Sequence, residues 1–266
     1  MSEAGAELEA LLALMRVLRD PVAGCPWDRQ QDFVSIAPFT IEEAYEVADA
    51  IGRGDLDRLR DELGDLLFQV VFHARIAEEA GRFDFAAVAR GIHDKLVRRH
   101  PHIFAEPKSV DVAQLHVSWE TQKARERAAA GMQGVLSDVP RALPALARAA
   151  KLGRRARRVG FDWPDAAGVR AKLDEELAEI DAALAAADHA QISDELGDLL
   201  FTIANWARHL QVDAEDALRR AALKFEQRFE CMEALAARDG RALAGLDAAQ
   251  WEQLWGQAKT LTTKVK

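Results

Sequence analysis

Cysteine, proline and aromatic residues are scarce in this sequence. Its 266 residues include two cysteines, eight prolines and 7% aromatic residues. Cys25 and Cys231 cannot build a disulfide framework and lack zinc-binding spacing, so we expect the reducing environment of the cytoplasm. No apolar run approaches the roughly 20 residues that span a bilayer, and no basic start precedes an apolar stretch. The sequence therefore predicts neither export nor insertion into a membrane.

Positive charge is also in deficit. The chain has 35 Lys and Arg against 44 Asp and Glu, which gives a formal net charge of −9 at pH 7. Polymeric nucleic acid needs a basic surface, so it is not an expected partner, although a few local cations can still hold an anionic small molecule. The sequence has no GxxxxGK[ST] or GxGxxG loop to cradle phosphates and no GxSxG elbow for a nucleophilic hydrolase.

The abundant residues are typical of helices. Alanine, leucine, glutamate and arginine dominate and alternating β-branched runs are nearly absent, so we predict an all-α fold. The 49% hydrophobic content is enough for a full core. Helices are expected, with boundaries good to about 2 to 4 residues, at 5–20, 38–51, 55–80, 84–99, 111–129, 140–158, 166–187, 191–210, 213–237 and 247–260.

One helical unit occurs twice. DELGDLLF stands at 61–68 and again at 194–201, and EEAYEVADAI at 42–51 matches EELAEIDAAL at 175–184 with the same offset of 133. Later matches have offsets of 129 and 136, namely Lys95 and Arg99 with Lys224 and Arg228, and Trp119 and Lys123 with Trp255 and Lys259. Glycine and proline in AAAGMQGVLSDVP mark the boundary between the copies. We predict an N-terminal domain at 1–127, a linker at 128–139 and a C-terminal domain at 140–266.

Each copy carries four carboxylates at helical spacing. Residues three apart share a helix face, so Glu43 lies beside Glu46, and Glu62 beside Asp65. If the two helices pack antiparallel across the turn IGRGDLDR, the carboxylates meet in one patch, which repels itself unless a cation neutralises it. Oxygen ligands without His or Cys indicate Mg²⁺, or Mn²⁺ in its place. The second copy repeats the set as Glu176, Glu179, Glu195 and Asp198.

These acids also fit two other interpretations. A solvated helix face with salt bridges four residues apart accounts for any single ExxD. All four acids stand in both copies although the copies differ elsewhere, as at Tyr45 and Ala178, and this favours a metal site. A di-iron carboxylate bundle needs ExxH pairs, and here Asp65 and Asp198 stand where the histidines would be.

Cations and aromatic residues follow the acids. Magnesium held by few carboxylates usually takes phosphate oxygens as further ligands, and pairs such as Lys95 and Arg99 lie one helical turn apart, where they can hold phosphate. Trp119 and Trp255 offer flat surfaces on which a base can stack. A solvated basic helix face, and a tryptophan that anchors the last helix on the core, are the alternative interpretations.

Together these motifs resemble the MazG family of nucleoside triphosphate pyrophosphohydrolases, in the all-α NTP pyrophosphatase group. The resemblance covers nearly the whole chain, through the acidic pairs of both halves and GCPWDRQQ at 24–31, KLVRRHPHIF at 95–104, VGFDWP at 159–164 and KFEQRF at 224–229. It implies Mg²⁺-dependent hydrolysis of NTPs and dNTPs between the α and β phosphates, giving a nucleoside monophosphate and pyrophosphate. It also implies a homodimer whose tandem helical domains form four-helix-bundle-like sites, and a role in clearing aberrant or excess nucleotides.

The resemblance further implies roles for single residues. The metal ligands would be Glu43, Glu46, Glu62 and Asp65 in the first copy and Glu176, Glu179, Glu195 and Asp198 in the second. The second set is favoured as catalytic, with nucleotide contacts from Lys172, Glu175, Lys224, Arg228, Trp255 and Lys259. The first copy has Phe39 in place of Lys172, which leaves open whether that copy is catalytic. The number of Mg²⁺ ions and the carboxylate that activates water stay open as well.

Two rival functions fit the same residues. A nucleotide-sensing or scaffold protein would bind Mg·NTP through these acids without hydrolysing it. Among enzymes, the nearest alternative is a narrow pyrophosphatase for one nucleotide, such as dUTP. Broad base specificity is favoured because the sequence offers stacking surfaces but no evident hydrogen-bonding pocket for one base edge.

Overall fold

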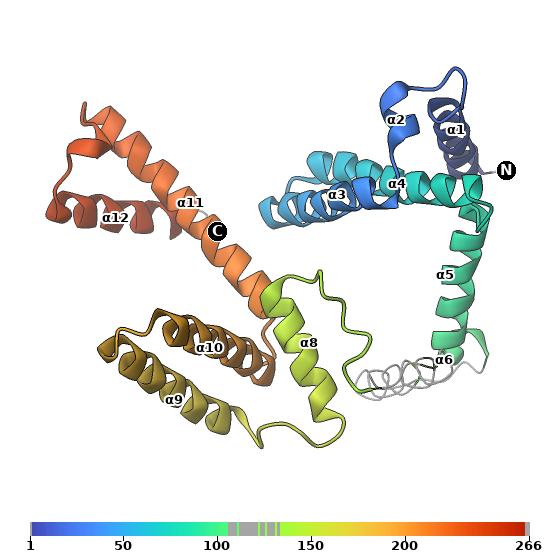
Figure 1. Ribbon diagram of the computed structural model, residues 1–266. Helices are drawn as coiled ribbons and strands as arrows, with labels where there is room; N and C mark the ends of the chain where they lie inside the picture. Colours follow the sequence, from blue (N-terminus) through green and yellow to red (C-terminus); the bar gives the residue numbers. More distant parts are fainter. Residues whose placement is uncertain are drawn as a thin grey trace. The chain divides into compact units, whose positions relative to one another are not determined.

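A computed structural model of the chain describes residues 2–105, 111, 122, 126, 131 and 134–263 (Figure 1). The chain divides into two compact units, which are Met1–Glu126 and Arg127–Lys266. All of the regular structure formed by the described residues is helical, so the predicted all-α fold class is confirmed. None of the described helices is both long and apolar enough to cross a bilayer.

The first unit is built around a helical hairpin. Its helices are α1 Glu3–Leu18, α2 Pro26–Gln30, α3 Phe33–Arg53, α4 Leu56–Glu79, α5 Phe85–Arg99 and α6 Pro101–Phe104. α3 and α4 form the hairpin, and α1 and α5 both pack on α4. Met15 of α1, Ile36 of α3 and Phe72 of α4 meet in the apolar core. Burial of these side chains holds α3 against α4, the two helices that carry the first set of acids.

The second unit contains two helical hairpins. Its helices are α8 Ala145–Arg157, α9 Ala166–Ala185, α10 His189–His209, α11 Ala214–Arg238 and α12 Ala248–Thr263, with a 3₁₀ turn, η1, at Leu243–Gly245. α9 packs on α10, α11 packs on α12, and α8 packs on both α10 and α11. Met232, Leu254 and Ala258 form the centre of an apolar core between α11 and α12. The second set of acids therefore lies on the first of these hairpins, and Trp255 lies on the other.

The two units begin their matching helices at matching residues. α9 and α10 start at the same offset from α3 and α4 that the acidic motifs have, and α11 starts at the same offset from α5 that the Lys and Arg pairs have. An aspartate precedes each of these six helices, and its carboxylate accepts hydrogen bonds from first-turn N–H groups that have no partner inside the helix. These aspartates are Asp32, Asp55 and Asp84 in the first unit and Asp165, Asp188 and Asp213 in the second. The sequence repeat is thus also a repeat of helix starts.

α3 begins earlier than the sequence analysis predicts. The expected start is residue 38, the position of Pro38, but the helix begins at Phe33. Asp32 and Ser35 form a capping box in which each side chain accepts a hydrogen bond from the other residue's backbone N–H. This box fixes the start upstream of Pro38, and the helix continues through the proline with the loss of one backbone hydrogen bond.

Other differences concern short elements. The sequence analysis does not predict α2, α6 or η1, each of which is five residues or shorter. α8 begins at Ala145 and not at residue 140, because Pro144 precedes its first turn. At the end of the predicted linker, Asp138 accepts a hydrogen bond from Arg155 and Val139 is buried. The helix expected at 111–129 lies outside the described residues, apart from single positions.

A buried ion pair joins the end of α10 to the loop that precedes α9. Arg208 Nη1 donates to Asp162 Oδ2 at 2.9 Å, and Arg208 Nη2 donates to the other oxygen of the same carboxylate. His209 Nε2 lies 3.1 Å from Asp162 Oδ1. Arg208 Nε donates to Asn205, which is fully buried. These contacts hold the hairpin of α9 and α10 at its open end.

Substituting Gly153 by alanine is expected to destabilise the second unit. A Cβ atom at this position would lie 1.9 Å from Oδ1 of Asn205, far inside van der Waals contact. Because Asn205 also holds Arg208, it has little freedom to move, and we expect a loss of about 1 to 3 kcal/mol in the free energy of unfolding. Gly256→Ala is the matched control, since a Cβ there meets nothing within 4 Å. Urea unfolding followed by circular dichroism measures both, and equal stabilities would contradict the prediction.

Candidate functional site

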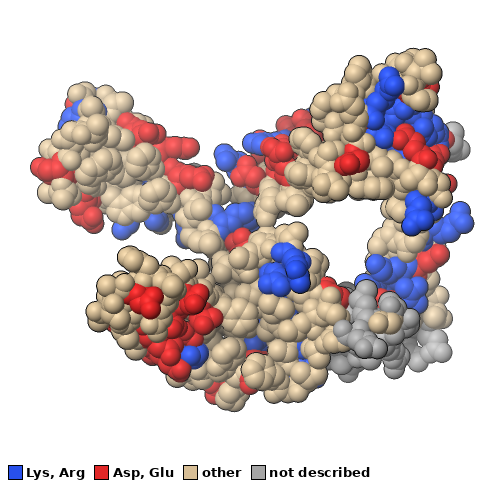
Figure 2. Space-filling model, in the orientation of Figure 1, with Lys and Arg blue, Asp and Glu red and all other residues tan. Residues whose placement is uncertain are grey.

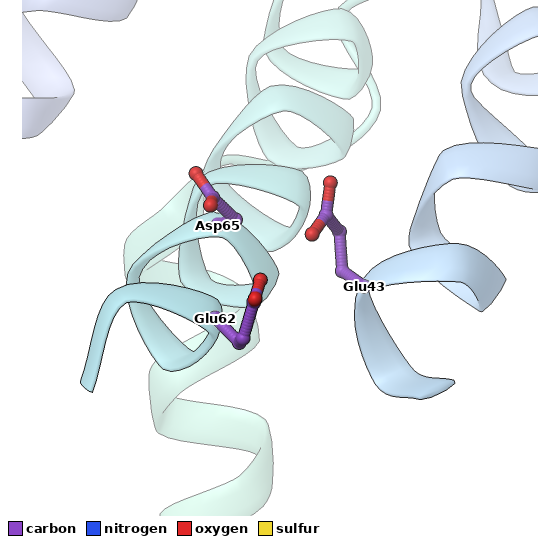
Figure 3. Close-up of side chains that lie close together, drawn as sticks. All are labelled: Glu43, Glu62 and Asp65. Atoms are coloured by element: carbon purple, nitrogen blue, oxygen red, sulfur yellow. The ribbon is translucent and has the colours of Figure 1, made fainter. Parts of the chain in front are cut away.

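Two helices supply the acids of the first copy. Glu43 stands on α3, and Glu62 and Asp65 stand one turn apart on α4, with the three carboxylates facing one another (Figure 3). Oxygen atoms from the three lie within 4.8 Å of one another. Glu46 is not one of this trio; it lies beside Glu62 and faces Arg58, whose Nη2 is 4.0 Å from Glu46 Oε1. The hairpin thus brings three of the four candidate ligands to one point.

The second copy gathers a different trio. Glu176 and Glu179 of α9 and Glu195 of α10 have carboxylate oxygens within 4.8 Å of one another. Glu176 is the most buried of them, with a relative exposure of 3%. Asp198, the fourth candidate ligand, is exposed on α10 and is not in this trio. Figure 2 shows that acidic side chains gather over α9 and α10.

Lys172 lies against the second trio. Its Nζ is 2.7 Å from Glu175 Oε1, 2.9 Å from Glu176 Oε1 and 3.8 Å from Glu179 Oε2. These partners, Glu175 first and then Glu176, raise the pKa of Lys172 above its ordinary value, so the ammonium stays charged. Two of the candidate nucleotide contacts, Lys172 and Glu175, therefore adjoin the carboxylates of the trio.

Burial and mutual repulsion act on the acids of both copies. Burial raises the pKa of Glu43 above its ordinary value, and the charge of Asp65 raises it further. Burial also raises the pKa of Glu179, while the charge of Lys172 acts in the opposite direction. Each cluster therefore holds more negative charge than its neighbours neutralise, which is the condition that favours binding of a cation.

A divalent cation fits the second trio. Oε2 of Glu176 is buried and has no hydrogen-bond partner in the part of the chain that the structure describes. A buried oxygen without a partner is costly, and Glu179 and Glu195 each have a carboxylate oxygen within 4.8 Å of one of the Glu176 oxygens. Hard cations such as Mg²⁺ prefer oxygen ligands of this kind. These residues can therefore hold a metal ion.

The remaining candidate nucleotide contacts lie on α11 and α12. The Arg228 guanidinium and the Lys259 ammonium lie 5.6 and 5.5 Å from the centre of the Trp255 ring, in cation–π geometry. Trp255 also packs on the core between α11 and α12, beside the ring of Phe225. It therefore anchors the last helix, which is the alternative to base stacking given in the sequence analysis. Lys224 is exposed one turn before Arg228 and, within the described ranges, makes no hydrogen bond or ion pair.

The candidate residues of the second unit thus form two groups, one on α9 and α10 and the other on α11 and α12. No hydrogen bond or ion pair between described residues joins the groups.

In the first unit, Arg99 donates to the Glu126 carboxylate. Trp119 and Lys123, the counterparts of Trp255 and Lys259, lie outside the described residues.

Two residues at the first cluster were missed by the sequence analysis. Arg58 Nε donates to Glu62 Oε1 at 2.9 Å, and Arg58 Nη1 lies 3.8 Å from Asp49 Oδ2. The sequence does contain a signal for Arg58 and Asp49, because the two copies differ at these positions. The second copy has Gln191 in place of Arg58 and Ala182 in place of Asp49. Residues that are shared by the two copies identify the acids but not the positions at which the copies differ.

Comparison with known proteins identifies the family of this chain. The family model of the MazG nucleotide pyrophosphohydrolase domain matches the chain twice, at residues 31–104 and 166–232. The first match covers α3 to α6, and the second runs from α9 into α11. The chain therefore belongs to the MazG family and carries two copies of its domain, which confirms the resemblance found in the sequence.

Several relatives match nearly the whole chain, and a solved structure matches less than half of it. A nucleoside triphosphate pyrophosphohydrolase of Escherichia coli K12 is 48% identical over 255 residues, which are 95% of this chain and 97% of that protein. The nucleoside triphosphate pyrophosphohydrolase/pyrophosphatase MazG of Thermotoga maritima is 42% identical over 259 residues, 97% of this chain and 98% of that protein. The crystal structure of a mazG-related protein from Thermotoga maritima matches 44% of this chain and 98% of its own, with 26% identity and a TM-score of 0.38.

Proposed function

We propose that this chain hydrolyses NTPs and dNTPs between the α and β phosphates, releasing a nucleoside monophosphate and pyrophosphate, with Mg²⁺ as its cofactor. One observation carries the proposal: Glu176, Glu179 and Glu195 have carboxylate oxygens within 4.8 Å of one another, and Oε2 of Glu176 is buried and has no partner among the described residues. The names of the two near full-length relatives support the same activity. Such an enzyme would clear aberrant or excess nucleotides.

The carboxylates of the trio and Lys172 have different roles in the proposed reaction. The carboxylates would hold Mg²⁺, or Mn²⁺ as its substitute, which when bound neutralises charge on the phosphate oxygens. A carboxylate of the site orients or deprotonates the attacking water, so no covalent intermediate with the protein is needed. Lys172 donates to Glu175 at 2.7 Å in the free chain and can exchange this carboxylate for a phosphate oxygen. Asp198 stands one turn from Glu195 and is proposed as a further ligand.

The group on α11 and α12 supports broad base specificity. Arg228 and Lys259 flank the Trp255 ring and can hold phosphate oxygens, with Lys224 one turn further along α11. A tryptophan face stacks on any base, because every base has a π-face. We therefore propose that several bases are accepted.

We further propose that the chain acts as a homodimer in the cytoplasm. Leu63 and Leu67 of α4, and Leu196 and Leu200 of α10, are exposed on the hairpins that carry the acids. Packing each hairpin against its copy in a second protomer would cover these side chains and complete a four-helix bundle. Both cysteines are free thiols, which suits a reducing compartment.

Product analysis tests the proposed reaction. The purified chain is incubated with MgCl₂ and each NTP and dNTP in turn, and the products are separated by ion-exchange chromatography. The expected result is nucleoside monophosphate and intact pyrophosphate from several bases, and no product when EDTA removes the metal. Diphosphate with orthophosphate would refute the cleavage position, and turnover of a single base would show a narrow enzyme. Binding of Mg·NTP without any product would indicate a sensor or scaffold.

A further inference from the structure

Among the described residues, each acidic cluster contacts one basic side chain, but the two copies supply it from different helices. In the second copy the cation is Lys172 of α9, whose Nζ lies 2.9 Å from Glu176. The first copy has Phe39 at that position and contacts Arg58 of α4 instead. The position of Arg58 is taken by Gln191 in the second copy. The two clusters are therefore not equivalent, although both copies carry the same four acids in their sequence.

Arg58 lies among three carboxylates. Its Nε donates to Glu62 Oε1 at 2.9 Å, its Nη1 is 3.8 Å from Asp49 Oδ2, and its Nη2 is 4.0 Å from Glu46 Oε1. Glu62 is a member of the first trio and its side chain is largely buried, with 11% exposed. The guanidinium cannot lose its proton and its planar fork is held by several partners, so it stays charged at this place.

The carboxylates around Arg58 differ between the two copies. In the first copy Glu46 faces Arg58 and is not in the trio, whereas its equivalent Glu179 belongs to the second trio. Asp49, the third carboxylate around Arg58, is replaced in the second copy by Ala182. The second copy thus lacks both the guanidinium and one of the acids that hold it.

We propose that Arg58 is a built-in counter-cation of the first cluster and weakens the binding of divalent metal ions there. The proposal rests on the proposed function, since it assumes that these acids bind a metal. A fixed positive charge bonded to Glu62 repels an incoming cation and occupies an oxygen that would bind it. Lys172 differs because its ammonium sits on a flexible stem, so it can leave the second trio when a metal and a phosphate arrive.

Titration with Mn²⁺ tests the proposal on the full chain. Glu176→Gln with Glu195→Gln first removes two carboxylates of the second trio, and free Mn²⁺ is followed by electron paramagnetic resonance. Adding Arg58→Gln, which installs the residue of the second copy, is expected to strengthen Mn²⁺ binding by about tenfold or more, because one repelling charge beside the ion is removed. Adding Glu62→Gln should then abolish the gain. Binding no tighter than in the variant with Glu176→Gln and Glu195→Gln alone would overturn the proposal.

Arg60→Gln is the matched control. Arg60 is on the same helix and carries the same charge, but its side chain is 72% exposed and pairs with Asp57 and Asp61 outside the trio. If Arg60→Gln strengthens Mn²⁺ binding as much as Arg58→Gln does, the effect comes from the net charge of the chain, and the proposed role of Arg58 is wrong. If Arg58→Gln misfolds because the acids around Arg58 repel one another, Arg58→Gln is combined with Asp49→Ala. This variant has both residues of the second copy, and the same gain in Mn²⁺ affinity is expected from it.

A parallel titration separates this inference from the proposed function. A chain with Glu43→Gln and Glu62→Gln keeps the second trio intact and should bind Mn²⁺. If it does so and Arg58→Gln brings no gain at the first cluster, only the role of Arg58 is wrong. If neither cluster binds Mn²⁺ in any variant, the role of Arg58 and the proposed metal dependence are both wrong.

Discussion

Replacing Glu176 and Glu195 by glutamine in the full chain is expected to reduce pyrophosphate release from NTPs by about a thousandfold or more. A metal ion stabilises such a transition state by several kcal/mol, and a loss of about 1.4 kcal/mol slows a reaction tenfold. Glutamine keeps the shape of glutamate but lacks its charge, so the metal ligands are lost while the packing of α9 on α10 is retained. The rate is measured at saturating MgCl₂ and NTP.

The double substitution should not lower the thermal stability. The trio contains three carboxylates within 4.8 Å of one another, and one buried oxygen of Glu176 has no partner among the described residues. Removing charge from this group relieves repulsion and lowers the cost of burying it, which offsets the lost ion pair of Glu176 with Lys172. A circular dichroism melt that matches or exceeds that of the parent chain would show that lost activity is not lost folding.

The matched control makes the same change in the first copy. Glu43→Gln with Glu62→Gln removes two carboxylates from the other trio and is expected to leave most of the activity. Equal losses in both double variants would mean that hydrolysis needs both copies. Loss only on substitution of Glu43 and Glu62 would move the catalytic site to the first unit and contradict the assignment.

The repeat explains why much of the fold could be predicted from the sequence. The same octapeptide and the same acidic pairs recur at a constant offset, and the helices that carry them start at residues with that same offset. Helical periodicity of the leucines and the aspartate that precedes each helix are local signals, so a single sequence contains them. The pairing of α3 with α4 follows from the short turn between them, and it places Glu43 opposite Glu62.

The composition of each trio could not be predicted in this way. The sequence offers four equivalent acids per copy, but the first copy assembles Glu43 with Asp65 while the second assembles Glu176 with Glu179. Which acids meet depends on contacts between helices, such as that of Arg58 on α4 with Glu46 on α3, and such contacts have no sequence period. The start of α3 is a different case: two local signals conflict there, and the capping box of Asp32 and Ser35 decides the start and not Pro38.

Arg208→Ala is expected to destabilise the second unit by about 3 to 5 kcal/mol, because removing one partner of a buried ion pair leaves the other charge without compensation. Arg208 is almost fully buried and makes two hydrogen bonds to Asp162, one of them at 2.9 Å. Arg170→Ala is the control: its pair with Asp174 is exposed, so less than about 1 kcal/mol should be lost. Urea unfolding followed by circular dichroism measures both losses, and similar values would contradict the prediction.

The same ion pair predicts a loss of stability in acid. Hydrogen bonds from Arg208, and then from His209, lower the pKa of Asp162 from 3.8 to about 2 against the cost of its burial. A carboxyl whose pKa is lower in the folded chain stabilises the fold above its ordinary pKa. This contribution, about 2 kcal/mol, is lost as the pH falls from about 5 to about 2. The free energy of unfolding of the parent chain should therefore fall more steeply over this range than that of Asp162→Asn.

Substituting both partners separates the ion pair from the packing around it. If the cost of Arg208→Ala comes from the uncompensated charge of Asp162, adding Asp162→Asn should recover part of the lost stability. Losses that simply add would instead assign the effect to the contacts of Arg208 with Asn205. Because Asp162 precedes α9 and Arg208 is near the end of α10, the pair sets the spacing of the helices that carry Glu176 and Glu195. A recovered variant should then also keep its Mn²⁺ affinity, since the three carboxylates would still meet.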